Sequence, residues 1–133
     1  MIEVNEYVRT NKGNIGKVVE IRLGFNKDTQ LYQNVYMLDN GLWTILEYIV
    51  NHSKQLIDLI GCGDIVNKEL VIGIIDITND KEEIIGKKLI TQYRSAQFTG
   101  LDIKHYIYAN GIKTILTKEQ FEANCYKVGG EDE

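Results

Sequence analysis

The chain has 133 residues, with 15 Lys and Arg against 19 Asp and Glu, which gives a formal net charge of −4. The acidic excess argues against non-specific nucleic-acid binding, which depends on Lys and Arg neutralising phosphates. No apolar run approaches the ~20 residues that a membrane span needs, and the acidic start Met1–Glu6 does not have the pattern of a signal peptide. We therefore expect a cytoplasmic protein without a membrane partner.

Short β-type runs separated by turn residues fill most of the chain, which predicts a mainly β fold with short helices. Asn-Gly between apolar runs is the strongest short hairpin signal, and it occurs twice. Both faces of the run Leu42–Val50 are largely apolar, which fits a strand covered on both sides or a single mixed core. The predicted hairpins join Glu6–Arg9 to Ile15–Ile21, Gln33–Leu38 to Leu42–Val50, and His105–Ala109 to Ile112–Leu116.

The two halves of the chain resemble each other, which predicts an internal duplication with chance similarity as the alternative. Tyr36–Leu46 and Tyr106–Leu116 share six identities in eleven positions, at an offset of 70 residues. Two further stretches, Ser53–Asp58 and Thr117–Glu122, each begin with a hydroxyl residue and are predicted to be helical. In the second stretch Thr117 is followed three residues later by Gln120, the spacing of a helix capping box.

This repeat predicts two small SH3-like barrels, or hairpin-rich half-domains, in tandem. Each would contain four strands, a short helical turn and a last strand, with Glu6 and Asp64 each leading into the first strand of its half. The boundary is expected at Gly61-Cys62-Gly63, since glycine permits a sharp change of direction. The same segment lacks the Lys and Ser or Thr of a phosphate-binding P-loop. The expected parts are therefore residues 1–62, residues 63–128 and an acidic tail at 129–133.

Residues for metal binding or nucleophilic catalysis are sparse. His52 and His105 have no His or Cys at ligand spacing. Cys62 and Cys125 are expected to be core thiols, because a free Cys usually behaves as a small hydrophobe. A Cys–His nucleophile is the alternative, since its partner needs to be near only in space. We expect no metal, no cofactor and no enzymatic activity.

The sequence favours protein binding over direct nucleic-acid binding. An acidic hairpin can contact a basic surface, such as that of a nucleic-acid-binding protein, and aromatic side chains can anchor the contact. The candidate partner-binding residues are Tyr32, Tyr36, Asp76, Asp80, Glu82 and Glu83. Direct nucleic-acid binding is the alternative, and it would use a wider set: Tyr32, Tyr36, Tyr48, Tyr93, Tyr106 and Tyr108 with Arg9, Lys12, Lys17, Lys87, Lys88 and Arg94. A protein that sequesters a small nucleotide is a further alternative, and it would need a concave pocket.

The stretches Asn5–Val18, Ile49–Asn67 and Leu116–Glu122 resemble a group of small accessory proteins encoded by phages and prophages of low-GC Gram-positive bacteria, whereas Gly73–Ile103 departs from the pattern. Most members of this group have no assigned activity. The resemblance implies a non-enzymatic protein that acts in the cytoplasm of the host cell. Its expected role is to bind and inhibit a host macromolecule, such as a CRISPR-Cas nuclease or another defence factor, as anti-CRISPR proteins do.

Overall fold

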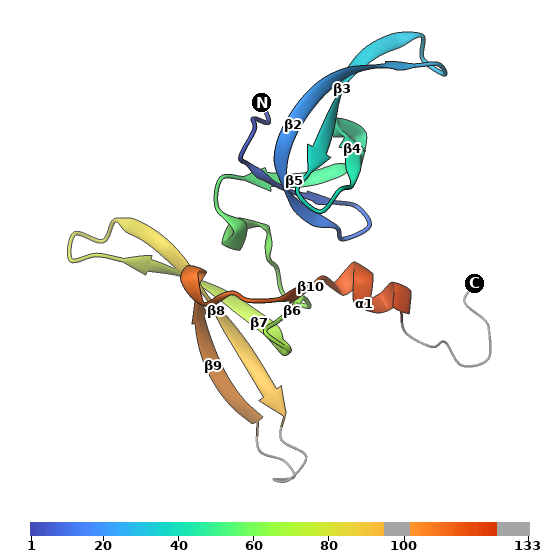
Figure 1. Ribbon diagram of the computed structural model, residues 1–133. Coiled ribbons are helices and arrows are strands. Elements are labelled where there is room, and N and C mark those ends of the chain that lie inside the picture. The colour runs from blue at the N-terminus through green and yellow to red at the C-terminus, as the bar shows by residue number, and fades with distance from the viewer. Residues whose placement is uncertain (95–101, 125–133) are drawn as a thin grey trace. The chain divides into compact units, whose positions relative to one another are not determined.

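A computed structural model shows two compact units, Met1–Ile60 and Gly61–Glu133, each built around one antiparallel sheet (Figure 1). The structure describes residues 1–94 and 102–124. The mainly β class predicted from the sequence is confirmed, with two five-stranded sheets and short helical segments. The units divide between Ile60 and Gly61, two residues before the expected boundary. The predicted acidic tail at 129–133 lies outside the described residues.

The first unit has the strand order β4-β3-β2-β1-β5 around a small apolar core. The core contains Ile2, Val8, Val18, Tyr36 and Leu38. The predicted first hairpin is confirmed, since β1 and β2 pair antiparallel. The elements are β1 (Tyr7–Thr10), β2 (Ile15–Asn26), β3 (Leu31–Leu38), β4 (Trp43–Ile45), the 3₁₀-helix η1 (Leu46–Tyr48), β5 (Ile49–Ser53) and the 3₁₀-helix η2 (Leu56–Leu59).

The second unit repeats this connectivity with the strand order β10-β6-β7-β8-β9. In both units the fifth strand lies beside the first, followed by the second, third and fourth, and a 3₁₀-helix separates the fourth strand from the fifth. The shared connectivity is what an internal duplication would produce. The elements are β6 (Ile65–Val66), β7 (Glu69–Thr78), β8 (Ile84–Arg94), β9 (Asp102–Tyr108), the 3₁₀-helix η3 (Ala109–Gly111), β10 (Ile115–Leu116) and α1 (Lys118–Asn124).

The prediction of one strand over Leu42–Val50 is wrong. The chain leaves β4 at Ile45, turns through η1 and enters β5 at Ile49, so β4 and β5 form opposite edges of the sheet. Leu46 and Tyr48 lie in the turn and are exposed, whereas a strand covered on both sides would have buried them. The 3₁₀-helix carries the chain across the sheet, which alternation of apolar residues alone does not reveal.

The two Asn-Gly signals have different outcomes. Asn40-Gly41 forms the predicted turn between β3 and β4, where Gly41 has φ +88°. Asn110-Gly111 instead lies in η3, and the hairpin predicted there is wrong because β10 pairs with β6 and β9 pairs with β8. The 70-residue sequence repeat therefore relates unlike positions, the third strand of one sheet and the fourth strand of the other.

The structural repeat relates the two shorter pairs of similar positions in the sequence, not the 70-residue repeat. Glu6 and Asp64 both precede the first strand of their unit, and Ser53 and Thr117 both stand at the end of the last strand. The predicted helices therefore come after that strand, and the helical turn before it is η1 or η3. The predicted capping box is confirmed: Gln120 N donates to Thr117 Oγ1 at 3.3 Å, and Thr117 N donates to Gln120 Oε1 at 3.2 Å.

The turn between β6 and β7 gives a stability prediction. Its central residues, Asn67 and Lys68, both have positive φ, at 52° and 69°, as in a type I′ hairpin turn. Lysine carries a steric cost there that glycine lacks. We expect Lys68→Gly to raise the free energy of unfolding of the second unit by about 0.5–1 kcal/mol. Urea unfolding followed by circular dichroism measures this, and a destabilised variant would contradict it.

Candidate functional site

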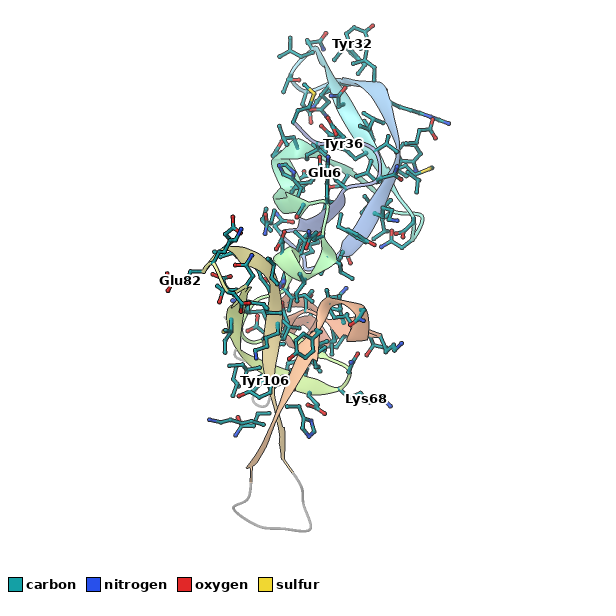
Figure 2. All side chains as sticks on the ribbon, turned by 90° about the vertical axis from the view of Figure 1, so that its left-hand side faces the viewer. Glu6, Tyr32, Tyr36, Lys68, Glu82 and Tyr106 are labelled. Atoms are coloured by element: carbon teal, nitrogen blue, oxygen red, sulfur yellow. The ribbon has the colours of Figure 1, made fainter. Side chains whose placement is uncertain are left out.

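The hairpin β2–β3 exposes large apolar side chains near its outer end. We call Leu23, Phe25, Leu31 and Tyr32 the apolar tip; these side chains are 47–69% exposed. The turn that precedes β3 is fixed by Asn26, whose Oδ1 accepts hydrogen bonds from Asp28 N at 2.9 Å and Thr29 N at 3.2 Å. Figure 2 shows Tyr32 at the outer end of this hairpin.

Strand pairing explains why the apolar tip is exposed. Phe25 pairs with Tyr32, and Ile21 pairs with Tyr36, so both pairs lie on the same face of the hairpin. That face covers the core at Tyr36 and continues beyond it. The rings of Phe25 and Tyr32 meet edge to face, with centroids 5.0 Å apart. Leu23, Phe25 and Tyr32 therefore form a surface on this face, ordered by the ring contact, whereas Leu31 lies on the opposite face.

Two tyrosines predicted to bind a partner differ in accessibility. Tyr32 is 68% exposed, whereas Tyr36 is 4% exposed and belongs to the core of the first unit. Figure 2 shows Tyr36 within the first unit. The buried position of Tyr36 contradicts its predicted role as a contact residue. Tyr36 lies four residues after Tyr32 along β3, which places it over the core.

The equivalent hairpin of the second unit, β7–β8, ends in acidic residues. We call Asp80, Glu82 and Glu83 the acidic tip; all three are exposed. Asn79 organises this turn, because its Oδ1 accepts hydrogen bonds from Lys81 N at 2.8 Å and Glu83 N at 3.0 Å. Glu82 has φ +62°, and Figure 2 shows it at the end of the hairpin.

Asp76, also predicted to contact a partner, is not at the acidic tip. It is exposed within β7 and pairs in register with Lys87 of β8. Next to the tip, Ile84 and Ile85 are each 64% exposed. The hairpin therefore combines a negative end with apolar side chains.

A groove in the first unit is the feature that the sequence did not predict. It has a volume of about 500 Å³ and lies between the β1–β2 loop, β4 and η1. Its walls combine an indole, a phenol, hydroxyls, amides and one lysine. The lining residues are Thr10, Asn11, Lys12, Asn14, Leu42, Trp43, Thr44 and Tyr48. The mistaken strand over Leu42–Val50 concealed it, because η1 brings Tyr48 to the loop: Asn11 N donates to Tyr48 O at 2.8 Å.

Cations stand over aromatic rings on both sheets. In the first unit Arg22 lies 5.5 Å from the ring centroid of Trp43 and forms an ion pair with Glu20. In the second unit Lys88 Nζ lies 4.5 Å from the ring centroid of Tyr106 and 5.8 Å from that of Tyr108. Such contacts fix the direction of a flexible cation across a sheet surface.

The other cations proposed for nucleic-acid contact have mixed positions. Arg9 is buried, and its Nη1 donates to Leu59 O at 2.8 Å, so it supports the fold of the first unit. Lys17 stands 5.4 Å from the ring centroid of Tyr7. The side chains of Tyr93 and Arg94 lie outside the part that the structure describes.

Each histidine pairs with a glutamate. In the first unit His52 Nδ1 donates to Glu6 Oε1 at 2.7 Å. This hydrogen bond lowers the pKa of the Glu6 carboxyl; burial opposes the effect, and Glu3 N assists it at 3.0 Å. In the second unit His105 Nδ1 lies 2.8 Å from Glu69 Oε1, which also accepts the Thr91 hydroxyl at 2.6 Å. Neither pair includes a Cys or Ser nucleophile. The first pair joins the residue before β1 to β5, and the second joins β7 to β9 across β8.

The Glu6 pair predicts acid sensitivity of the first unit. Because the pKa of Glu6 is lower folded than unfolded, its stabilising effect is complete above the unfolded pKa of about 4.3 and is lost as pH falls through the folded pKa. We expect Glu6→Gln to be destabilising at neutral pH and progressively less so below about pH 5. Urea unfolding followed by fluorescence of Trp43, the one tryptophan in the chain, measures this. A destabilisation that does not change between neutral and acidic pH would contradict it.

One cysteine and the potential metal ligands can be placed within the described residues. Cys62 is a free, exposed thiol, so its predicted core role is wrong, and Cys125 lies outside the described residues. Within residues 1–94 and 102–124, no three His, Cys, Asp or Glu side chains are arranged to hold a metal ion. In the same ranges no helix has the length and apolar character needed to cross a membrane.

No family model, no curated protein and no solved structure matches the chain. The two sheets share one connectivity, and their equivalent hairpins end in an apolar tip and an acidic tip.

Proposed function

We propose that this protein is a non-enzymatic binding protein that inhibits a host protein by covering its functional surface. In this proposal each unit is an SH3-like barrel scaffold. Five strands in the order fifth-first-second-third-fourth, with a helical turn before the last strand, support that assignment. The scaffold presents its second and third strands as a long hairpin.

The apolar tip is the observation that carries the proposal. Leu23, Phe25 and Tyr32 are exposed on one face of the hairpin, and the Phe25–Tyr32 contact orders two of them. Contiguous exposed apolar surface on a protein is typical of an interaction site. Aromatic side chains provide much of the binding energy at protein interfaces, because they bury a large area with few rotatable bonds.

The acidic tip indicates the kind of partner. Asp80, Glu82 and Glu83 form a negative end that complements a basic protein surface. Proteins that bind nucleic acid have such surfaces, and nucleases of host defence, including CRISPR-Cas nucleases, are among them. The resemblance to phage accessory proteins supports the same class of target. Occlusion of the basic surface would block its access to nucleic acid.

Affinity capture from nuclease-treated lysate of a low-GC Gram-positive bacterium tests the proposal. The bait is the tagged wild-type protein, compared with an apolar-tip variant, Phe25→Ala with Tyr32→Ala, and an acidic-tip variant, Asp80→Lys with Glu82→Lys. Glu83 is left intact because its Oε1 accepts a hydrogen bond from Asn79 Nδ2. The matched control reverses two exposed charges elsewhere, Glu47→Lys with Glu122→Lys.

We expect one stoichiometric host protein with wild type and with the control, and its loss with both tip variants. Inhibition of that protein's activity by wild type completes the test. Capture that survives both tip changes would overturn the proposed surface. Absence of any stoichiometric protein with a folded bait would overturn protein inhibition in that host.

A further inference from the structure

One face of the second unit's sheet gathers two tyrosines and two lysines. Alternation along β9 places Lys104, Tyr106 and Tyr108 on the same face. Across the sheet Tyr106 pairs with Ile90 and Tyr108 pairs with Lys88, so both neighbours share that face. Leu89 and Thr91, on the opposite face of β8, are fully buried. The face with the tyrosines is therefore the outer one; we call Lys88, Lys104, Tyr106 and Tyr108 the tyrosine face.

The charge of the tyrosine face is opposite to that of the whole chain. Among the side chains that the structure describes on the outer face of β7, β8 and β9, two are lysines and none is a carboxylate. The nearby acids of β7 are on the other face: Glu69 accepts the hydroxyl of buried Thr91, and Asp76 pairs with Lys87. In the first unit the corresponding face holds Glu20, which neutralises Arg22. In the second unit Lys88 and Lys104 have no such acidic neighbour among the described side chains of this face.

The two rings form a platform with a cation beside it. Tyr106 is 55% exposed and Tyr108 is 49% exposed. They are two residues apart on one strand, about 7 Å along its axis, which allows each ring to take one base of an extended strand. Lys88 Nζ lies 4.5 and 5.8 Å from the two ring centroids, so it is close to the phosphate of a nucleotide stacked on either ring.

We propose that the tyrosine face binds single-stranded nucleic acid, with bases stacked on Tyr106 and Tyr108 and phosphates neutralised by Lys88 and Lys104. Stacking tolerates any base, because every base has a π face, so little sequence preference is expected. A duplex keeps its bases inside and cannot use the platform. This site uses neither the apolar tip nor the acidic tip, so it goes beyond the inhibitor role and stands or falls separately.

Fluorescence anisotropy with a labelled oligothymidylate of about 15 nucleotides, and with the corresponding duplex, tests the site. We expect wild type to prefer the single strand. Tyr106→Ala or Tyr108→Ala should weaken binding about fivefold or more, whereas Tyr106→Phe should retain it because the ring remains. Lys88→Gln should reduce the slope of log affinity against log salt by about 0.7.

Matched controls come from the first unit. Tyr32→Ala removes an exposed tyrosine, and Lys27→Gln removes an exposed charge; both variants should bind the oligonucleotide like wild type. The proposal is overturned if folded wild type does not bind at about 50 mM salt, where phosphate contacts are strong. It is also overturned if the duplex binds as tightly as the single strand. A third contrary result would be that the wild-type protein binds no oligonucleotide while Tyr106→Ala abolishes its capture of a host protein.

Discussion

Asp64→Ala is expected to lower the free energy of unfolding of the second unit by about 3–5 kcal/mol. The Asp64 side chain is fully buried, at 1% exposure. Its Oδ2 accepts a hydrogen bond from Gly61 N at 2.8 Å, and its Oδ1 accepts one from Lys118 N at 2.9 Å. Alanine would remove both acceptors, and unpaired N–H groups in such a place are costly because water cannot replace the carboxylate.

The same carboxylate joins distant parts of the unit. It fixes the turn that enters β6 and holds the start of α1, 54 residues further along the chain. Asp64→Asn keeps the shape and one acceptor oxygen, so we expect an intermediate loss. Hydrogen exchange of the peptides covering residues 61–66 and 117–120 would show faster opening in Asp64→Ala. A loss below about 1 kcal/mol would contradict the expected role of these hydrogen bonds.

The parts of the fold that the sequence predicted depend on neighbouring residues. The Thr117–Gln120 capping box, the β1–β2 hairpin and the Asn40-Gly41 turn are each specified within a few residues. The failures involve sequence-distant pairing. Asn110-Gly111 has a strong hairpin signal, but the segment after it is held by Asn67. The Asn67 Oδ1 accepts hydrogen bonds from Lys113 N at 2.7 Å and from Thr114 N at 3.1 Å. This tertiary contact guides β10 to β6.

The candidate surfaces show the same division. The exposed acids of the β7–β8 turn were predictable because a run of polar and charged residues marks a hairpin tip. Tyr106, Tyr108 and Lys88 were among the nucleic-acid candidates of the sequence, but their meeting on one face was not predictable. It depends on register, because only the pairing of Tyr108 with Lys88 brings the cation to the rings. The groove beside Trp43 was hidden for a related reason, since η1 interrupts a run whose apolar character predicts a strand.

Substitutions of Tyr32 and Tyr36 distinguish a role in folding from a role in binding. They share β3 and the same face of the hairpin, but Tyr36 lies over the core and Tyr32 lies beyond it. We expect Tyr36→Ala to lower the free energy of unfolding of the first unit by about 3–5 kcal/mol, because it leaves a cavity between β-strands in the core.

Tyr32→Ala should cost about 1 kcal/mol, mainly from the lost ring contact with Phe25. Urea unfolding followed by Trp43 fluorescence measures both changes, since Trp43 reports on the first unit alone. Equal losses of unfolding free energy in the two variants would show that the apolar tip stabilises the fold of the first unit as the core does. A small loss for Tyr32→Ala, together with failed capture of the host protein, would show that the tip is kept exposed for a partner. The aromatic surface is then explained by binding, because it contributes too little to stability to be explained by folding.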